Sequence, residues 1–200
     1  MGRSFCYQCH KAASQCICHL ISIVENKTPI VILQHFRERF HPIGTARFAV
    51  LGLANCELHV AHSGLPGNST SAIKKGGWKD RTLNTELSLP EGCAVLFPSS
   101  RAEPLTKESP PSSLLVLDAT WSHARRLYYE NPWIEQMRHV SLAPKDASRY
   151  LIRKEPARHC VSTLEAIILA LKILEPETDG YEGLLSAFDA MIKNQSEFLS

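Results

Sequence analysis

Short apolar runs, separated by segments of helical pattern, constrain the fold of this chain more than any other feature. Residues 29–34, 57–62, 93–97, 114–117 and 139–143 form these runs, and their composition predicts strands. Strands that alternate with helices predict an α/β fold with a mostly parallel sheet.

The ends of three predicted strands carry polar or conformationally special residues. Gln34 and His35 follow the first, Phe97, Pro98 and Ser99 the third, and Asp118 the fourth. Ligands of such sheets bind beyond the carboxyl ends of the strands, so these segments are the first candidates for a site.

Helical patterns are expected over residues 43–53 and 121–131, where Pro132 ends the second. Two further helices are expected to close the chain, and their apolar positions predict core-facing sides. Ser162 or Thr163 is a suitable N-cap for the first of these, with Glu165 in its first turn. Residues 99–113 are expected to form an exposed loop.

The composition is that of a globular protein. The chain has 200 residues, of which 44% are hydrophobic and 21% charged, and this length predicts one domain with room for a small appendage. The sequence contains neither a run long enough to span a membrane nor a secretory signal, so we expect a cytoplasmic protein. Glycine-rich nucleotide-binding motifs and a G-x-S-x-G nucleophile elbow are also absent from the sequence.

Charge is distributed unevenly along the chain. Residues 1–158 carry a net charge of +7 and residues 159–200 a net charge of −5. A basic body suits a polyanion such as nucleic acid, although a solvated basic surface would give the same count. The basic residues near glycines or aromatic residues are the candidates for contacts with RNA phosphates: Lys74, Lys75, Lys79, Arg81, Arg125 and Arg126.

Four cysteines lie close together near the N-terminus: Cys6, Cys9, Cys16 and Cys18. Their spacing, C-x2-C-x6-C-x-C, suits a closed tetrahedral site for structural zinc. His10 or His19 could replace one cysteine, and a redox pair or a chance cluster are the alternatives. We therefore expect a small zinc-binding module over residues 1–25 and a catalytic domain over residues 26–200. Cys56, Cys93 and Cys160 have apolar neighbours and are expected to be packing residues.

Asp118 is the strongest candidate for a catalytic residue. It ends a predicted strand, and a carboxylate in this position can act as a general base. The alternative is structural, because Asp118 or Thr120 could cap the helix that follows. Trp121 could likewise be a core residue.

Taken in order along the chain, these segments resemble the DTW-domain family, the tRNA-uridine aminocarboxypropyltransferases. The similarity rests on seven segments: the cysteine cluster, Leu33-Gln34-His35 with Glu38, Thr45-Ala46-Arg47, Leu96-Phe97-Pro98-Ser99, Asp118-Ala119-Thr120-Trp121, residues 150–156 and Ser162-Thr163-Leu164-Glu165-Ala166. The family often has proline after Gln-His, where this chain has Phe36.

The resemblance implies a SPOUT-like fold with a C-terminal trefoil knot. It also implies transfer of the 3-amino-3-carboxypropyl group of S-adenosylmethionine to N3 of a tRNA uridine, in the variable loop, with release of methylthioadenosine. Asp118 would be the base, and Trp121 and Ala124 would pack around the methyl group of the donor. The other residues expected to bind the donor are Leu96, Phe97, Pro98, Ser99, Thr120, Tyr150, Leu151, Arg153, Ser162 and Thr163.

Two other functions remain open at this point. A SPOUT-type RNA methyltransferase would use the same donor and differ in which carbon faces the acceptor. A non-enzymatic zinc-knuckle RNA-binding protein would need no donor, although the intact segment Asp118–Trp121 argues against it. The oligomeric state is open, since SPOUT methyltransferases are often dimers; a monomer is slightly favoured, because one chain could carry the whole site.

Overall fold

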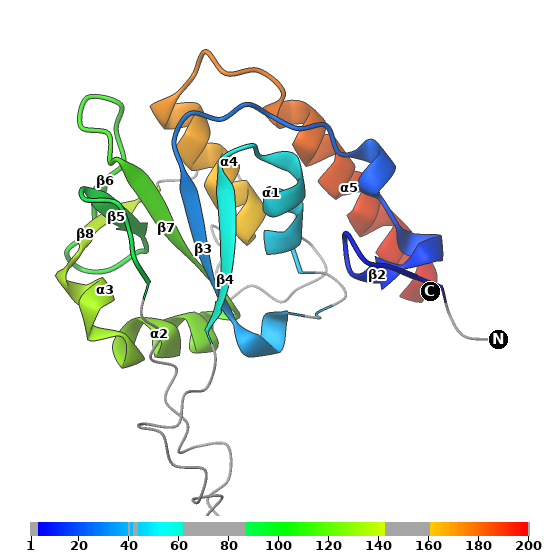
Figure 1. Cartoon of the computed structure of the whole chain (residues 1–200), viewed down its shortest axis with the longest axis horizontal. Coiled ribbons are helices and arrows are strands. Elements are labelled where there is room, and N and C mark those ends of the chain that lie inside the picture. Colours follow the sequence, from blue (N-terminus) through cyan, green and yellow to red (C-terminus); the bar gives the residue numbers. More distant parts are fainter. Residues whose placement is uncertain (1–3, 40, 42–43, 62–86, 143–160, 200) are drawn as a thin grey trace, which may run out of the picture.

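The computed structural model describes residues 4–39, 41, 44–61, 87–142 and 161–199. Within them, a six-stranded sheet has the order β4-β3-β7-β5-β8-β6, and every pairing in it is parallel (Figure 1). The predicted mostly parallel α/β sheet is therefore confirmed. Its strands are β3 (Ile30–His35), β4 (Cys56–Ala61), β5 (Cys93–Leu96), β6 (Glu103–Pro104), β7 (Ser113–Asp118) and β8 (Arg138–Ser141).

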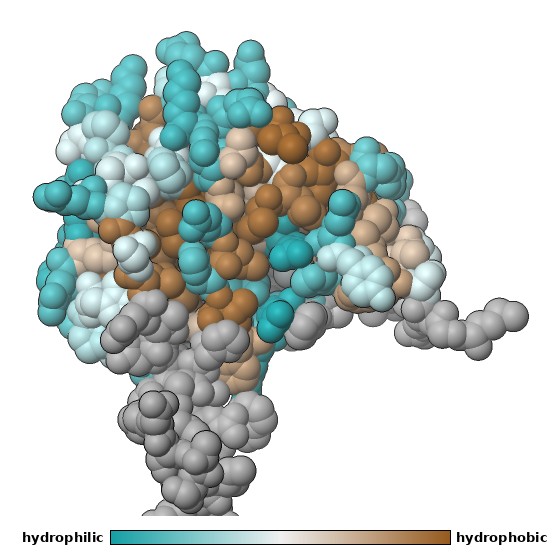
Figure 2. Space-filling model, viewed as in Figure 1, coloured by the Kyte–Doolittle hydropathy of each residue, from teal (hydrophilic) through white to brown (hydrophobic). Residues whose placement is uncertain are grey.

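Helices cover both faces of the sheet. One face packs against α1 (Ala46–Gly52), α4 (Thr163–Leu174) and α5 (Tyr181–Leu199), and the other against α2 (Trp121–Glu130) and α3 (Pro132–Gln136). Figure 2 shows apolar side chains over the middle of this view and hydrophilic ones toward its rim.

The two cores follow from the alternation of side chains along the strands. Ile30 and Ile32 of β3 belong to the core beneath α1, α4 and α5, whereas Val31 and Leu33 belong to the core beneath α2. Both faces of β3 and β7 are buried, which explains why residues 30–33 and 114–117 are apolar without interruption.

The start of α4 is fixed by its own sequence. Ser162 is the N-cap, its hydroxyl accepts a hydrogen bond from the backbone N–H of Glu165, and the Glu165 carboxylate accepts one from the N–H of Ser162. This reciprocal pair is a capping box and stabilises a helix start by about 1 kcal/mol. The structure thus selects Ser162 over Thr163 as the cap.

Two local expectations need correction. Pro132 ends the preceding helix as expected, but it is also the first residue of α3, where its missing N–H costs nothing. The predicted loop over residues 99–113 contains β6, and Leu105 within it is buried because this segment joins the edge of the sheet beside β8.

The N-terminal segment forms a small unit against the main body. It contains the antiparallel hairpin β1 (Phe5–Cys6) and β2 (Lys11–Ala12), followed by the short helices η1 (Ala13–Gln15) and η2 (Cys18–Leu20). Ile17 is fully buried in the same core as α5. The division at residue 25 stays a prediction.

The SPOUT-like knot also stays a prediction, because it depends on residues 143–160, which lie outside the described part. No helix among the described residues has the length and apolar character that crossing a membrane requires.

Candidate functional site

The carboxyl edge of the sheet brings together three of the segments singled out from the sequence. β3, β7 and β5 are neighbours, and their last residues are His35, Asp118 and Leu96. Because parallel strands end on the same side, the polar residues after them share one edge of the molecule.

Asp118 lies at the centre of this edge and is 5% exposed. Its Oδ2 accepts a 2.7 Å hydrogen bond from Nε2 of Gln34, the residue paired with it across the sheet. Its Oδ1 accepts a 2.6 Å hydrogen bond from the hydroxyl of Thr163 in the first turn of α4. The carboxylate is thus oriented from both sides.

Asp118 does not cap α2, although the sequence left that role open as an alternative. Thr120 occupies the N-cap position of α2, without a side-chain capping bond, and its hydroxyl lies 3.3 Å from that of Ser122. Trp121 begins α2 with 36% of its surface exposed, so it is not a core residue. Ala124, one turn further, is buried.

The turn after β5 carries the next group of candidates. Phe97 stacks on Tyr128 of α2, with ring centroids 4.8 Å apart, and its backbone N–H donates to the carbonyl of Val140. Pro98 is exposed. The Ser99 hydroxyl is buried and has no hydrogen-bond partner among the described residues, so a polar ligand atom could satisfy it.

His35 is a feature of this edge that the sequence alone did not distinguish from a core histidine. It is 1% exposed and stacks on His123 of α2, with ring centroids 4.1 Å apart. Burial, and then the proximity of His123, lowers the pKa of His35 to about 4. Its Nδ1 accepts from the N–H of Arg37, so the neutral ring carries its proton on Nε2, which has no partner among the described residues.

The candidate RNA contacts are only partly described. Arg125 is exposed on α2, and Arg126 forms a 2.6 Å ion pair with Glu130 one turn later. The remaining candidates for RNA or donor binding lie outside the described residues: Lys74, Lys75, Lys79, Arg81, Tyr150, Leu151 and Arg153.

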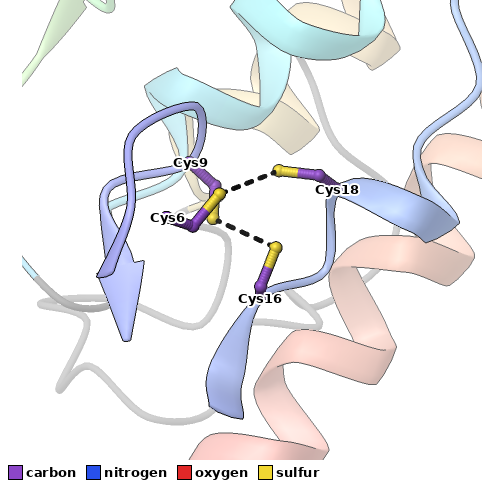
Figure 3. A group of neighbouring side chains, drawn as sticks. All are labelled: Cys6, Cys9, Cys16 and Cys18. Carbon is purple, nitrogen blue, oxygen red and sulfur yellow. Dashed lines mark hydrogen bonds between the residues drawn. The ribbon is translucent and has the colours of Figure 1, made fainter. Parts of the chain in front are cut away.

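The four N-terminal cysteines converge on one point (Figure 3). Their sulfur atoms all lie within 4.8 Å of one another, with Cys6 Sγ 3.8 Å from Cys18 Sγ and Cys9 Sγ 3.9 Å from Cys16 Sγ. A zinc ion at about 2.3 Å from four sulfurs would hold them about 3.8 Å apart, whereas a disulfide needs about 2 Å. The cluster therefore fits zinc.

Backbone hydrogen bonds favour the thiolate form of Cys6, which is the form that binds a metal ion. Hydrogen bonds from the backbone of Cys9 and then of Gln8 lower the pKa of Cys6 to about 6. Burial raises the pKa of Cys9 and of Cys18, and a bound cation would oppose that effect.

Among the cysteines outside the cluster, Cys93 is buried and Cys56 half-buried, and burial raises the pKa of both. Cys160 lies outside the described residues.

Comparison with known proteins decides the family. The model of the DTW domain matches residues 3–196. The chain belongs to the DTW-domain family. No solved structure matches it significantly.

The curated proteins that this DTW protein resembles are named for an activity on tRNA. It is 29% identical over 96% of its length to proteins of Macaca fascicularis and Mus musculus, each named tRNA-uridine aminocarboxypropyltransferase 2. It is 28% identical over 98% of its length to tRNA-uridine aminocarboxypropyltransferase A of Arabidopsis thaliana. The chain spans 64% of the length of the macaque and mouse proteins and 83% of the plant protein.

Proposed function

We propose that this DTW protein is a tRNA-uridine aminocarboxypropyltransferase that acts in the cytoplasm. It would transfer the 3-amino-3-carboxypropyl group of S-adenosylmethionine to N3 of a uridine in the variable loop, with methylthioadenosine as the second product. The observation that carries this proposal is the buried Asp118 carboxylate, oriented at the carboxyl edge within a chain that matches its family from end to end.

The chemistry requires a base and control over which carbon reacts. S-adenosylmethionine supplies an electrophilic carbon attached to positively charged sulfur. The N3 proton of uracil passes to the Asp118 carboxylate and later to water. N3 then bonds to the terminal carbon of the aminocarboxypropyl group. The bond between that carbon and sulfur breaks, and its electron pair stays on sulfur in neutral methylthioadenosine.

The residues along the edge would hold the donor so that only this carbon faces N3. Trp121 and Ala124 would lie against its methyl group, and an aromatic face also favours a cation. The turn of residues 96–99 would contact the adenosine, with the unpartnered Ser99 hydroxyl as one hydrogen-bonding group. Thr120, Ser162 and Thr163, together with residues 150–153, would hold the amino-acid end or shape the pocket around it.

The remaining expectations belong to the same proposal. The body is a SPOUT-like domain with a C-terminal trefoil knot, and the cysteine cluster binds structural zinc. The basic residues at 74–81 and 125–126 contact tRNA phosphates. A monomer is sufficient, since Asp118, Gln34, Thr163 and the turn after β5 come from one chain.

The test uses the purified chain, S-adenosylmethionine and tRNA that lacks its modifications. We expect the digested tRNA to contain uridine that has gained an aminocarboxypropyl group, with an equal amount of methylthioadenosine released. Uridine that has gained only a methyl group would identify a methyltransferase instead. Unmodified tRNA, with no binding of S-adenosylmethionine detected by calorimetry, would favour an RNA-binding protein without catalysis.

A further inference from the structure

The β1–β2 hairpin presents aromatic rings to solvent. Tyr7 is 84% exposed and Phe5 44% exposed, and their rings meet edge to face with centroids 5.7 Å apart. Figure 1 shows this hairpin at one end of the molecule, beside the C-terminal part of α5. Adjacent exposed aromatic residues on a small module are typical of a binding surface rather than of packing.

The rings are held on a rigid support. Phe5 and Tyr7 flank Cys6, so the cysteine cluster fixes the backbone that carries them. Arg47 of α1 donates a 2.8 Å hydrogen bond from Nε to the carbonyl of Gln8, which ties the hairpin to the main body. Phe5 also stacks on His10, with ring centroids 6.0 Å apart.

The surroundings of the rings are basic. Residues 1–24 contain no aspartate or glutamate. Arg47 Nη2 lies 3.4 Å from His10 Nε2. Aromatic rings with an arginine beside them match an unpaired nucleotide, whose base stacks while its phosphate is neutralised.

Exposed arginines also lie beside the candidate site. The short helix η3 (Phe36–Glu38) follows the end of β3 directly, and the exposed side chains of Arg37 and Arg39 come from this stretch. The edge that carries Asp118 is therefore basic at the end of β3, which suits the approach of a polyanion.

We propose that Tyr7 and Phe5 stack on an unpaired nucleotide of the tRNA, with Arg47 at its phosphate. This inference rests on the proposed function only in taking tRNA as the substrate. The zinc module would then contribute to substrate binding as well as to the fold.

The test compares Tyr7→Ala with Tyr7→Phe in binding to unmodified tRNA, measured by fluorescence anisotropy without donor. Loss of one stacked base weakens binding by about 5- to 150-fold, so we expect a Kd increase in that range for Tyr7→Ala. Tyr7→Phe keeps a ring and should stay close to the wild type. Ile23→Ala, which truncates a 67% exposed apolar side chain near the module, is the matched control and should bind normally.

Zinc content and thermal stability should be the same in all variants, since Tyr7 is largely exposed. With donor present, Tyr7→Ala should raise the KM for tRNA and leave kcat unchanged at saturating tRNA. An unchanged Kd for Tyr7→Ala overturns the inference, and if the wild type still modifies tRNA, the proposed function stands. Conversely, weakened binding in a chain that transfers no group would support the stacking surface and refute only the transferase.

Discussion

The hydroxyl of Thr163 donates a 2.6 Å hydrogen bond to the carboxylate of Asp118, although 45 residues separate them in the chain. This contact joins the first turn of α4 to the end of β7. The start of α4 is itself fixed by the capping box of Ser162 and Glu165. The orientation of the proposed base thus depends on where a distant helix begins.

Asp118→Asn should keep the fold and lose most activity. The amide oxygen can still accept from Gln34, and its NH₂ can donate to the Thr163 hydroxyl, so the unfolding temperature should stay near that of the wild type. Loss of a general base lowers turnover by about 10²- to 10⁴-fold. Single-turnover transfer to tRNA, followed by nucleoside mass spectrometry, measures this change.

Thr163→Val and Thr163→Ser are a matched pair of variants that tests the hydrogen bond to Asp118 through the free energy of unfolding. The valine variant removes the donor to Asp118 Oδ1 and should destabilise the fold by about 1.5–3 kcal/mol, whereas the serine variant keeps the hydroxyl. Near-normal turnover in Asp118→Asn would instead assign Asp118 the structural role of joining β3, β7 and α4.

The cysteine cluster should hold one zinc ion per chain. Metal analysis of protein purified without a metal-affinity tag measures this stoichiometry directly. Cys16→Ala should lose the ion and lower the unfolding temperature, since three sulfurs cannot close a tetrahedral site. Cys56→Ala changes a cysteine outside the cluster and should retain full zinc content. A metal-free chain that folds stably and remains active would contradict the prediction.

The ends of the strands were predictable from the sequence because each strand is marked by a local run of apolar residues. The apolar run of β7 stops at Asp118, and both faces of that strand are buried, so its sequence shows no alternation of polar residues and stands out as one run. The cysteine cluster was equally predictable, since all four cysteines lie within one short segment.

The partners of Asp118 could not be predicted, because they depend on strand order. β7 lies between β3 and β5, which precede it in the chain, and only this insertion pairs Gln34 with Asp118. No local pattern encodes that register. The stacking of His35 on His123 has the same origin, since it follows from how α2 crosses the sheet.

His35 should make the fold sensitive to mild acid. Its pKa is about 4 in the folded chain, against about 6.5 when unfolded, so between these values the unfolded chain binds more protons. The free energy of unfolding should therefore fall as pH decreases from 6.5 toward 4, by at most about 3 kcal/mol from this residue. Burial also lowers the pKa of His139, which adds to the trend.

Chemical denaturation at several pH values tests this prediction. His35→Phe keeps an aromatic ring against His123 but cannot titrate, so its stability should depend less on pH. Equal slopes for His35→Phe and the wild type would show that His35 does not contribute.

Two glycine-to-alanine changes should have opposite effects on stability. A Cβ at Gly52, in the last turn of α1, would collide with the side chain of Leu184 on α5, whereas a Cβ at Gly183 meets nothing within 4 Å. Gly52→Ala should therefore cost about 1–3 kcal/mol through overpacking. Gly183→Ala should be neutral or gain up to about 1 kcal/mol, because alanine favours the helix.

Urea denaturation of both variants measures these differences, and the double variant Gly52→Ala with Leu184→Ala tests their cause. If the collision is responsible, the cost of Gly52→Ala should shrink once Leu184 is truncated. A Gly52→Ala variant as stable as Gly183→Ala would mean that α1 and α5 do not approach each other at this point. The close approach matters for the N-terminal unit as well, because α1 also carries Arg47, which ties the β1–β2 hairpin to the body.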